Sequence, residues 1–157
     1  MLRRIFLSVA LLAAQPAFAQ STAPIIHTAA DLQQREARLI EAAKASPTGM
    51  AADNMDDFGT YHTMLAVRVH TGPAERHQLW ADQMIVNKGT VTLVIGGNMQ
   101  DEHPNGTRPG ETLGAGIQGG TEIVLHPGDI VHIPANVPHW VKLAPGDTTT
   151  YLIFKEK

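Results

Sequence analysis

The chain has 157 residues, of which 43% are hydrophobic and 17% are charged, and its formal net charge is −3. A chain of this length forms one domain with a single core, and its slightly acidic charge argues against a nucleic-acid-binding protein. The sequence has no cysteine, which excludes disulfides and thiol nucleophiles, so the hydrophobic core must stabilise the fold alone.

The first 19 residues have the three parts of a secretory signal peptide. Arg3 and Arg4 are basic, residues 5–14 are apolar, and residues 17–19 read Ala-Phe-Ala, a small-residue cleavage site. The apolar run is too short for a transmembrane helix, which needs roughly 20 residues, and Pro16 interrupts it. We therefore expect cleavage after Ala19 and an exported product, periplasmic or secreted, that keeps no membrane segment.

Residues 20–60 are predicted to form a leader and one helix. Thr28 and Asp31 have the spacing of a capping box, and good helix formers continue to Ala45. Apolar residues that fall on one face of this helix are expected to pack on the rest of the domain, namely Leu32, Leu39, Ile40 and Ala43. The polar segment 50–59 is expected to be irregular.

From residue 61 onward the sequence alternates with a period of two, as β-strands do. Short runs of β-formers are separated by Gly, Pro and Asn turns, which is typical of an antiparallel sandwich or barrel. We predict an all-β domain over 61–157, with strands at 61–70, 82–88, 90–95, 122–125, 129–133, 140–143 and 148–154. The Gly-rich residues 96–121 have no period and are expected to form a mobile loop over the barrel mouth.

Four residues of this domain suit metal binding. Glu75 and His77 leave the same face of a strand, Asp82 follows after room for a turn and a return strand, and His139 begins a later strand. A barrel can bring these groups to one interior point. Two imidazoles with one or two carboxylates suit a borderline divalent cation.

The segment around His77 resembles the first motif of the cupin superfamily, and the likeness extends over residues 67–154. Gly89 matches the last glycine of the motif and His77 matches its second histidine. Glu75 stands in the place of the first histidine, and Asp82 replaces the glutamate. The first motif is therefore degenerate, with two ligand positions changed.

The segment that ends at His139 resembles the second cupin motif more closely. Gly128, Pro134 and His139 match it in spacing, whereas Asn136 replaces a glycine and Leu143 replaces an asparagine. Asn136 is a mild change, because asparagine tolerates the left-handed conformation better than most residues.

The resemblance implies a jelly-roll barrel that pairs into a homodimer and holds one divalent metal ion with Glu75, His77, Asp82 and His139. Ligation rich in oxygen favours Mn²⁺, Fe²⁺, Zn²⁺ or Ni²⁺ over copper. Each residue also has another role open to it, such as capping a loop or strand, or a local pair between Glu75 and Arg76. Pocket-lining or surface roles remain open for Arg68, His70 and His132, packing or dimer contacts are expected of Trp80 and Trp140, and solvent exposure is expected of His103.

Three functions are compatible with this interpretation. The first is a metal-dependent enzyme, of the oxygenase, lyase or isomerase type, that acts on a small oxygen-rich molecule. The second is a non-catalytic exported cupin that binds a metal or a small ligand. The third is a metal-free barrel in which the acid and histidine residues form a buried cluster. Fold alone does not choose among them.

Overall fold

The computed structural model describes residues 23–157, so the predicted signal peptide lies outside the described residues.

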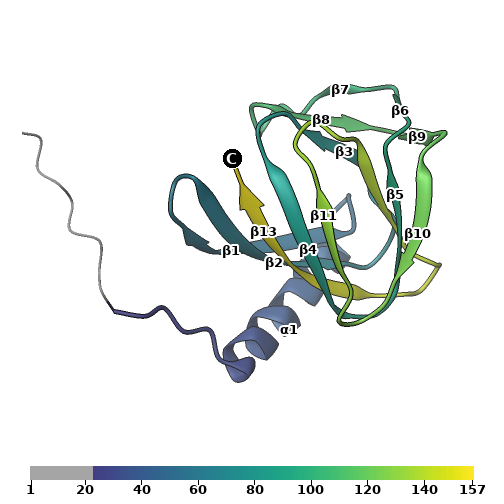
Figure 1. Cartoon of the computed structure of the whole chain (residues 1–157). Helices are drawn as coiled ribbons and strands as arrows, with labels where there is room; N and C mark the ends of the chain where they lie inside the picture. Colours follow the sequence, from purple (N-terminus) through teal and green to yellow (C-terminus); the bar gives the residue numbers. More distant parts are fainter. Residues whose placement is uncertain (1–22) are drawn as a thin grey trace, which may run out of the picture.

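Two antiparallel sheets face each other as a barrel (Figure 1). The five-stranded sheet has the order β1-β2-β13-β4-β11, the six-stranded sheet has the order β10-β5-β12-β3-β8-β7, and β6 pairs with β9. The strands are β1 (Met50–Asp57), β2 (Tyr61–Arg68), β3 (Ala74–His77), β4 (Ala81–Lys88), β5 (Val91–Ile95), β6 (Asn98–Gln100), β7 (His103–Pro104), β8 (Glu111–Gly114), β9 (Gly116–Gln118), β10 (Thr121–Leu125), β11 (Ile130–Ile133), β12 (His139–Lys142) and β13 (Thr149–Glu156). The predicted all-β class is confirmed, and each of the seven predicted strands is found with bounds that differ by at most two residues.

Helix α1 (Ala29–Ala45) begins at the predicted capping box. Asp31 N–H donates to the Thr28 hydroxyl, and the Asp31 carboxylate accepts from Thr28 N–H. The helix packs against β1 and β2 and lies below the barrel in Figure 1. Within residues 23–157, no helix has the length and apolar character that a membrane crossing requires.

The prediction of an irregular segment at 50–59 is wrong, because Met50–Asp57 forms strand β1 at the edge of the five-stranded sheet. Its polar side chains find partners outside the core. Asp53 accepts a hydrogen bond from Arg35 of α1 at 2.6 Å, and Asp56 accepts one from Thr63 on β2 at 3.0 Å. An edge strand needs apolar residues on one face only. Strand β1 therefore contains few β-forming residues, and β-propensity does not predict it.

The prediction for residues 96–121 is also wrong in part. This segment contains β6, β7, β8 and β9, which are only two to four residues long. Strand β8 extends the six-stranded sheet by pairing with β3. The turn between β7 and β8, residues 105–110, lines two of the cavities described below.

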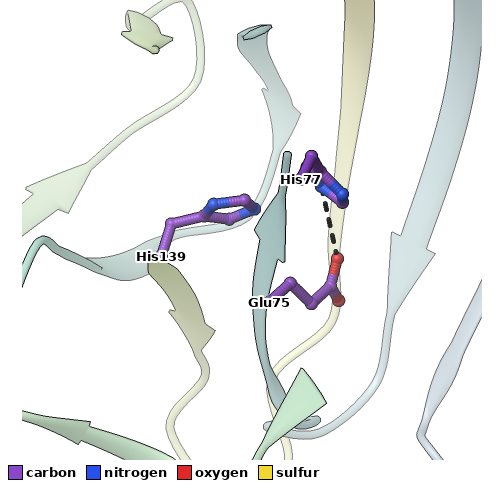
Figure 2. Close-up of side chains that lie close together, drawn as sticks. All are labelled: Glu75, His77 and His139. Carbon is purple, nitrogen blue, oxygen red and sulfur yellow. Dashed lines mark ion pairs between the residues drawn. The ribbon is translucent and has the colours of Figure 1, made fainter. Parts of the chain in front are cut away.

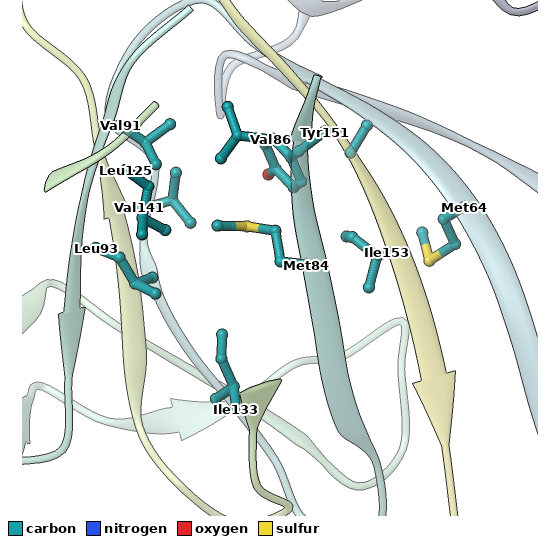
Figure 3. Close-up of a cluster of buried hydrophobic side chains, with 11 residues drawn as sticks. Met64, Met84, Val86, Val91, Leu93, Leu125, Ile133, Val141, Tyr151 and Ile153 are labelled. Atoms are coloured by element: carbon teal, nitrogen blue, oxygen red, sulfur yellow. The ribbon is translucent and has the colours of Figure 1, made fainter. Parts of the chain in front are cut away.

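The hydrophobic core fills the space between the two sheets (Figure 3). It consists of Met64, Ala66, Met84, Val86, Val91, Leu93, Leu125, Ile133, Val141, Tyr151 and Ile153. The glycine that matches the end of the first motif, Gly89, is required by backbone conformation and packing. Gly89 has φ +76°, and a Cβ there would lie 2.3 Å from the carbonyl oxygen of Thr148, so no larger residue fits at this turn.

Candidate metal centre

Strands β3 and β12 bring three of the four predicted ligands together. His139 is the direct cross-strand neighbour of Glu75, and directly opposed side chains lie close on one face of a sheet. The turn before β12 is fixed to β3, because Asn136 N–H donates to the His77 carbonyl at 2.7 Å. Asn136 has φ +65°, so the substituted glycine position of the motif does adopt the left-handed conformation.

Figure 2 shows Glu75, His77 and His139 facing one another across a small space. Each offers one ligand atom, and these atoms all lie within 4.8 Å of one another. Asp82 comes from β4 in the opposite sheet, and its Oδ2 lies 3.4 Å from His77 Nε2. The side chains of His77 and Asp82 are each 7% exposed and that of Glu75 is 15% exposed. Asp82 lines the same cavity as the other three predicted ligands, but it does not belong to the group whose ligand atoms all lie within 4.8 Å of one another.

Each carboxylate has one oxygen bound to a buried cation. Glu75 Oε1 accepts a hydrogen bond from Arg68, whose Nε donates to the Tyr151 hydroxyl at 2.8 Å. Asp82 Oδ1 accepts a hydrogen bond from Lys155 at 2.5 Å. The second oxygens, Glu75 Oε2 and Asp82 Oδ2, lie 3.9 and 3.4 Å from His77 Nε2. The cations therefore fix the carboxylates and leave one oxygen of each directed at the shared space.

The two histidines are held in the same way through Nδ1. His77 Nδ1 lies 3.1 Å from Glu111 Oε1, and His139 Nδ1 lies 3.2 Å from the Val137 carbonyl. A histidine whose Nδ1–H donates to an oxygen has its Nε2 lone pair free for a metal ion, and such outer partners are typical of metal sites. The donor set of two imidazole nitrogens and two carboxylate oxygens fits a divalent cation.

The pKa values reflect these pairs. Burial by itself raises the pKa of Glu75, but Arg68, His139 and His77 outweigh it and lower the pKa to about 2. Burial also raises the pKa of Asp82, and the hydrogen bond from His77 and the charge of Lys155 lower it to about 2. Both carboxylates are therefore ionised at neutral pH.

The two histidines differ in their pKa. Burial lowers the pKa of His77, but its hydrogen bonds to Asp82 and Glu111 raise it to about 9. Burial dominates at His139 and lowers its pKa. Without a metal ion, His77 is therefore protonated at neutral pH and His139 is neutral.

The sequence did not single out Glu111 or Lys155 in this site, and Arg68 was left with alternative roles. Arg68 lines the cavity, is only 2% exposed and pairs with Glu75, so the alternative of a local pair between Glu75 and Arg76 is wrong. Arg76 instead pairs with Glu102 on the outside. The three other candidate histidines do not line the cavity among the ligands. They are exposed on the surface and are His70, His103 and His132. Trp140 donates to the Gly72 carbonyl, and Trp80 packs on His62.

A cavity of about 20 Å³ lies among the ligands. This volume suits an ion or a single water molecule. Its base is apolar, with Met84, Ile133 and Val141 of the core, while Glu75, His77 and His139 line the polar part.

We expect Glu111→Gln to weaken metal binding about tenfold, because a residue that orients a metal-binding histidine contributes about 10- to 100-fold to metal affinity. Glu111 is 6% exposed, and its other oxygen accepts from Asn105 at 3.0 Å, so glutamine keeps the shape of the site but weakens the hydrogen bond to His77. Metal affinity is measured above the pKa of His77, so that its proton does not compete. Glu122→Gln, on an exposed pair with Lys142, is the control, and equal affinities for the two variants would contradict the role of Glu111.

No protein-family model and no curated protein sequence matches the chain. Among solved structures, a recombinant oxalate oxidase in complex with glycolate is similar over 72% of this chain, with a TM-score of 0.51 and 14% identity. The Cnp3 cupin domain of Schizosaccharomyces pombe is similar over 69% of this chain and 61% of its own, with a TM-score of 0.50 and 4% identity. The chain spans about half the length of the oxalate oxidase, of which 53% is covered. Two facing antiparallel sheets and these structural neighbours together show that the chain has the cupin fold.

Proposed function

We propose that this protein is a metal-dependent cupin enzyme that acts on a small oxygen-rich molecule. One observation carries the proposal: Glu75, His77 and His139 each offer one ligand atom, these atoms all lie within 4.8 Å of one another, and Asp82 lines the same cavity. Glu75 and Asp82 are held by Arg68 and Lys155, and His77 and His139 are held through Nδ1.

Catalysis is supported by the number of protein donors and by the space beside them. Four protein donors leave two positions of an octahedral ion such as Mn²⁺ or Fe²⁺ open for a substrate. A divalent ion held there supplies Lewis acidity towards a substrate oxygen or, as Fe²⁺, reactivity with dioxygen. The structural similarity to an oxalate oxidase, an enzyme with a small oxygen-rich substrate, supports the same proposal.

The residues of the chain itself have separable tasks in this proposal. The apolar base of the cavity, with Met84, Ile133 and Val141, excludes bulk water and strengthens electrostatic interactions in the site. Arg68 and Lys155 hold Glu75 and Asp82 in fixed rotamers. They also neutralise the charge of the two carboxylates, which therefore offset less of the positive charge of a divalent ion.

We also propose that the protein is exported and forms a homodimer. The signal-peptide pattern of residues 1–19 supports export. The end strands β10 and β11 support pairing of two copies, because Val124 and Ile130 on them are 54% and 58% exposed and exposed apolar edges are usually covered.

Elemental analysis of purified protein tests the metal centre. We expect about one divalent ion per chain in the wild type and a content near the detection limit in His139→Ala, because that variant removes one of two imidazole donors. His132→Ala is the matched control, since His132 lies exposed on β11 and its loss should leave the metal content unchanged. Metal-supplemented wild-type protein that carries no ion, or a folded His139→Ala that retains a full complement, would exclude the proposed centre.

A further inference from the structure

The charges around the centre do not cancel once a divalent ion is bound. Three carboxylates lie within the cluster, those of Glu75, Asp82 and Glu111, and two buried cations face them, Arg68 and Lys155. With neutral histidines this cluster carries one negative charge, so a divalent ion leaves it with one positive charge. A buried site with a net charge favours a ligand of the opposite sign.

Arg108 adds a further positive charge at the mouth. It lies in the turn between β7 and β8, whose backbone is fixed: Arg108 N–H donates to the Asn105 carbonyl, and Glu111 N–H donates to the Arg108 carbonyl, both at 3.2 Å. The guanidinium itself is not held by a short contact. Its side chain is 55% exposed, and NH1 lies 3.8 Å from Glu111 Oε2, which is too far for a hydrogen bond. Arg108 therefore combines a fixed backbone with free donors.

The position of Arg108 connects the centre with the space outside it. Arg108 lines the cavity of about 20 Å³ together with Glu75, His77 and His139. It also lines two wider hollows of about 270 and 330 Å³. Thr107 and Glu111 line both hollows but not the inner cavity. Among the residues that the structure describes, Arg108 is the one that lines the inner cavity and both hollows, so a ligand that extends from the centre into either hollow lies near its side chain.

We propose that the mouth of this centre binds small organic carboxylates and that Arg108 is the specificity-determining residue that selects their negative charge. The inference rests on the proposed function, because the net positive charge requires a bound divalent ion. A guanidinium presents paired N–H donors that match the two oxygens of a carboxylate. A neutral amide of the same shape has a single carbonyl oxygen and no charge, so it binds more weakly at such a site.

Calorimetric titration of the Zn²⁺-loaded protein with succinate, and with succinamide as the neutral analogue, tests this inference. We expect succinate to bind and succinamide to bind at least tenfold more weakly, because hydrogen bonds to charged groups are stronger than neutral ones. Arg108→Gln should lower succinate affinity about 10- to 100-fold and leave succinamide affinity unchanged. Arg108→Lys should fall between the two, because it keeps the charge but loses the paired donors.

Arg38→Gln is the matched control. Arg38 is likewise exposed and lies 3.8 Å from a carboxylate, that of Asp53, but it belongs to α1, away from the centre. Its loss should leave succinate affinity unchanged. The zinc content is measured after each titration, so that removal of the ion by succinate is not read as binding.

The outcomes separate the two proposals. If the protein takes up no zinc, the proposed metal centre is excluded. Zinc-loaded protein that binds succinate and succinamide equally, or whose succinate affinity is the same with Arg108→Gln, leaves the metal centre standing and overturns the role of Arg108.

Discussion

Replacement of Arg68 by methionine should lower the free energy of unfolding of the metal-free protein by about 3–5 kcal/mol, the usual cost of removing one partner of a buried ion pair. Arg68 is 2% exposed, and its guanidinium donates both to Glu75 and to the Tyr151 hydroxyl. Methionine fills much of the volume but leaves the Glu75 carboxylate buried without its main counter-charge. Chemical denaturation at neutral pH measures the loss.

A second variant separates the charge effect from packing. Arg68→Met combined with Glu75→Gln removes the orphaned charge, so most of the lost stability should return. Arg35→Met serves as the surface control, because Arg35 and Asp53 lie 2.6 Å apart but are 29% and 31% exposed. Its cost should stay below about 1 kcal/mol. Equal costs for Arg68→Met and Arg35→Met would contradict the importance of the buried pair.

The strands that could be predicted are those whose side chains alternate between core and surface. In β13, Tyr151 and Ile153 face the core while Leu152 and Phe154 are more exposed, and this alternation is legible in the sequence. Strand β1 could not be predicted in this way. Its aspartates pair with side chains from α1 and β2, and those partners are known only once the sheet is assembled.

The candidate ligands could be predicted because they stand at the ligand positions of the two motifs. Their buried partners could not be predicted in this way. Lys155 is the direct cross-strand neighbour of Asp82, 73 residues away, and Glu111 is the direct neighbour of His77. Both contacts depend on the register between strands that are distant in the chain, and register is set by the whole sheet. A search for a lysine or glutamate at a fixed spacing from His77 has no reason to select either residue.

The same cross-strand register divides the centre between the two sheets. Glu75 and His139 meet through β3 and β12 in one sheet, and Asp82 and Lys155 meet through β4 and β13 in the other. Each pair lies within one sheet, so the position of Asp82 relative to the other ligands depends on how the two sheets pack against each other. The centre is thus positioned by the rigid barrel rather than by loops, as precise ligand geometry requires.

The affinity for a divalent ion should rise about 50-fold between pH 7 and pH 9, because a bound proton competes with the ion at His77. The pKa of His77 in the metal-free protein is raised from 6.5 to about 9, since its hydrogen bonds to Asp82 and Glu111 outweigh the effect of burial. Below about pH 9 the ion must therefore displace one proton from His77. Well below this pH, the apparent metal affinity rises about tenfold with each pH unit.

The other ligands do not contribute to this slope. Burial lowers the pKa of His139, so it is neutral already, and the pKa values of Glu75 and Asp82 are both about 2. Affinity should therefore level off once the pH passes about 9. Chelator-buffered zinc titrations across this range measure the slope, and calorimetry at pH 7 in buffers of different ionisation enthalpy should count about one released proton. A flat profile with no proton release would place the ion away from His77 Nε2, because no other proposed ligand holds a proton at neutral pH.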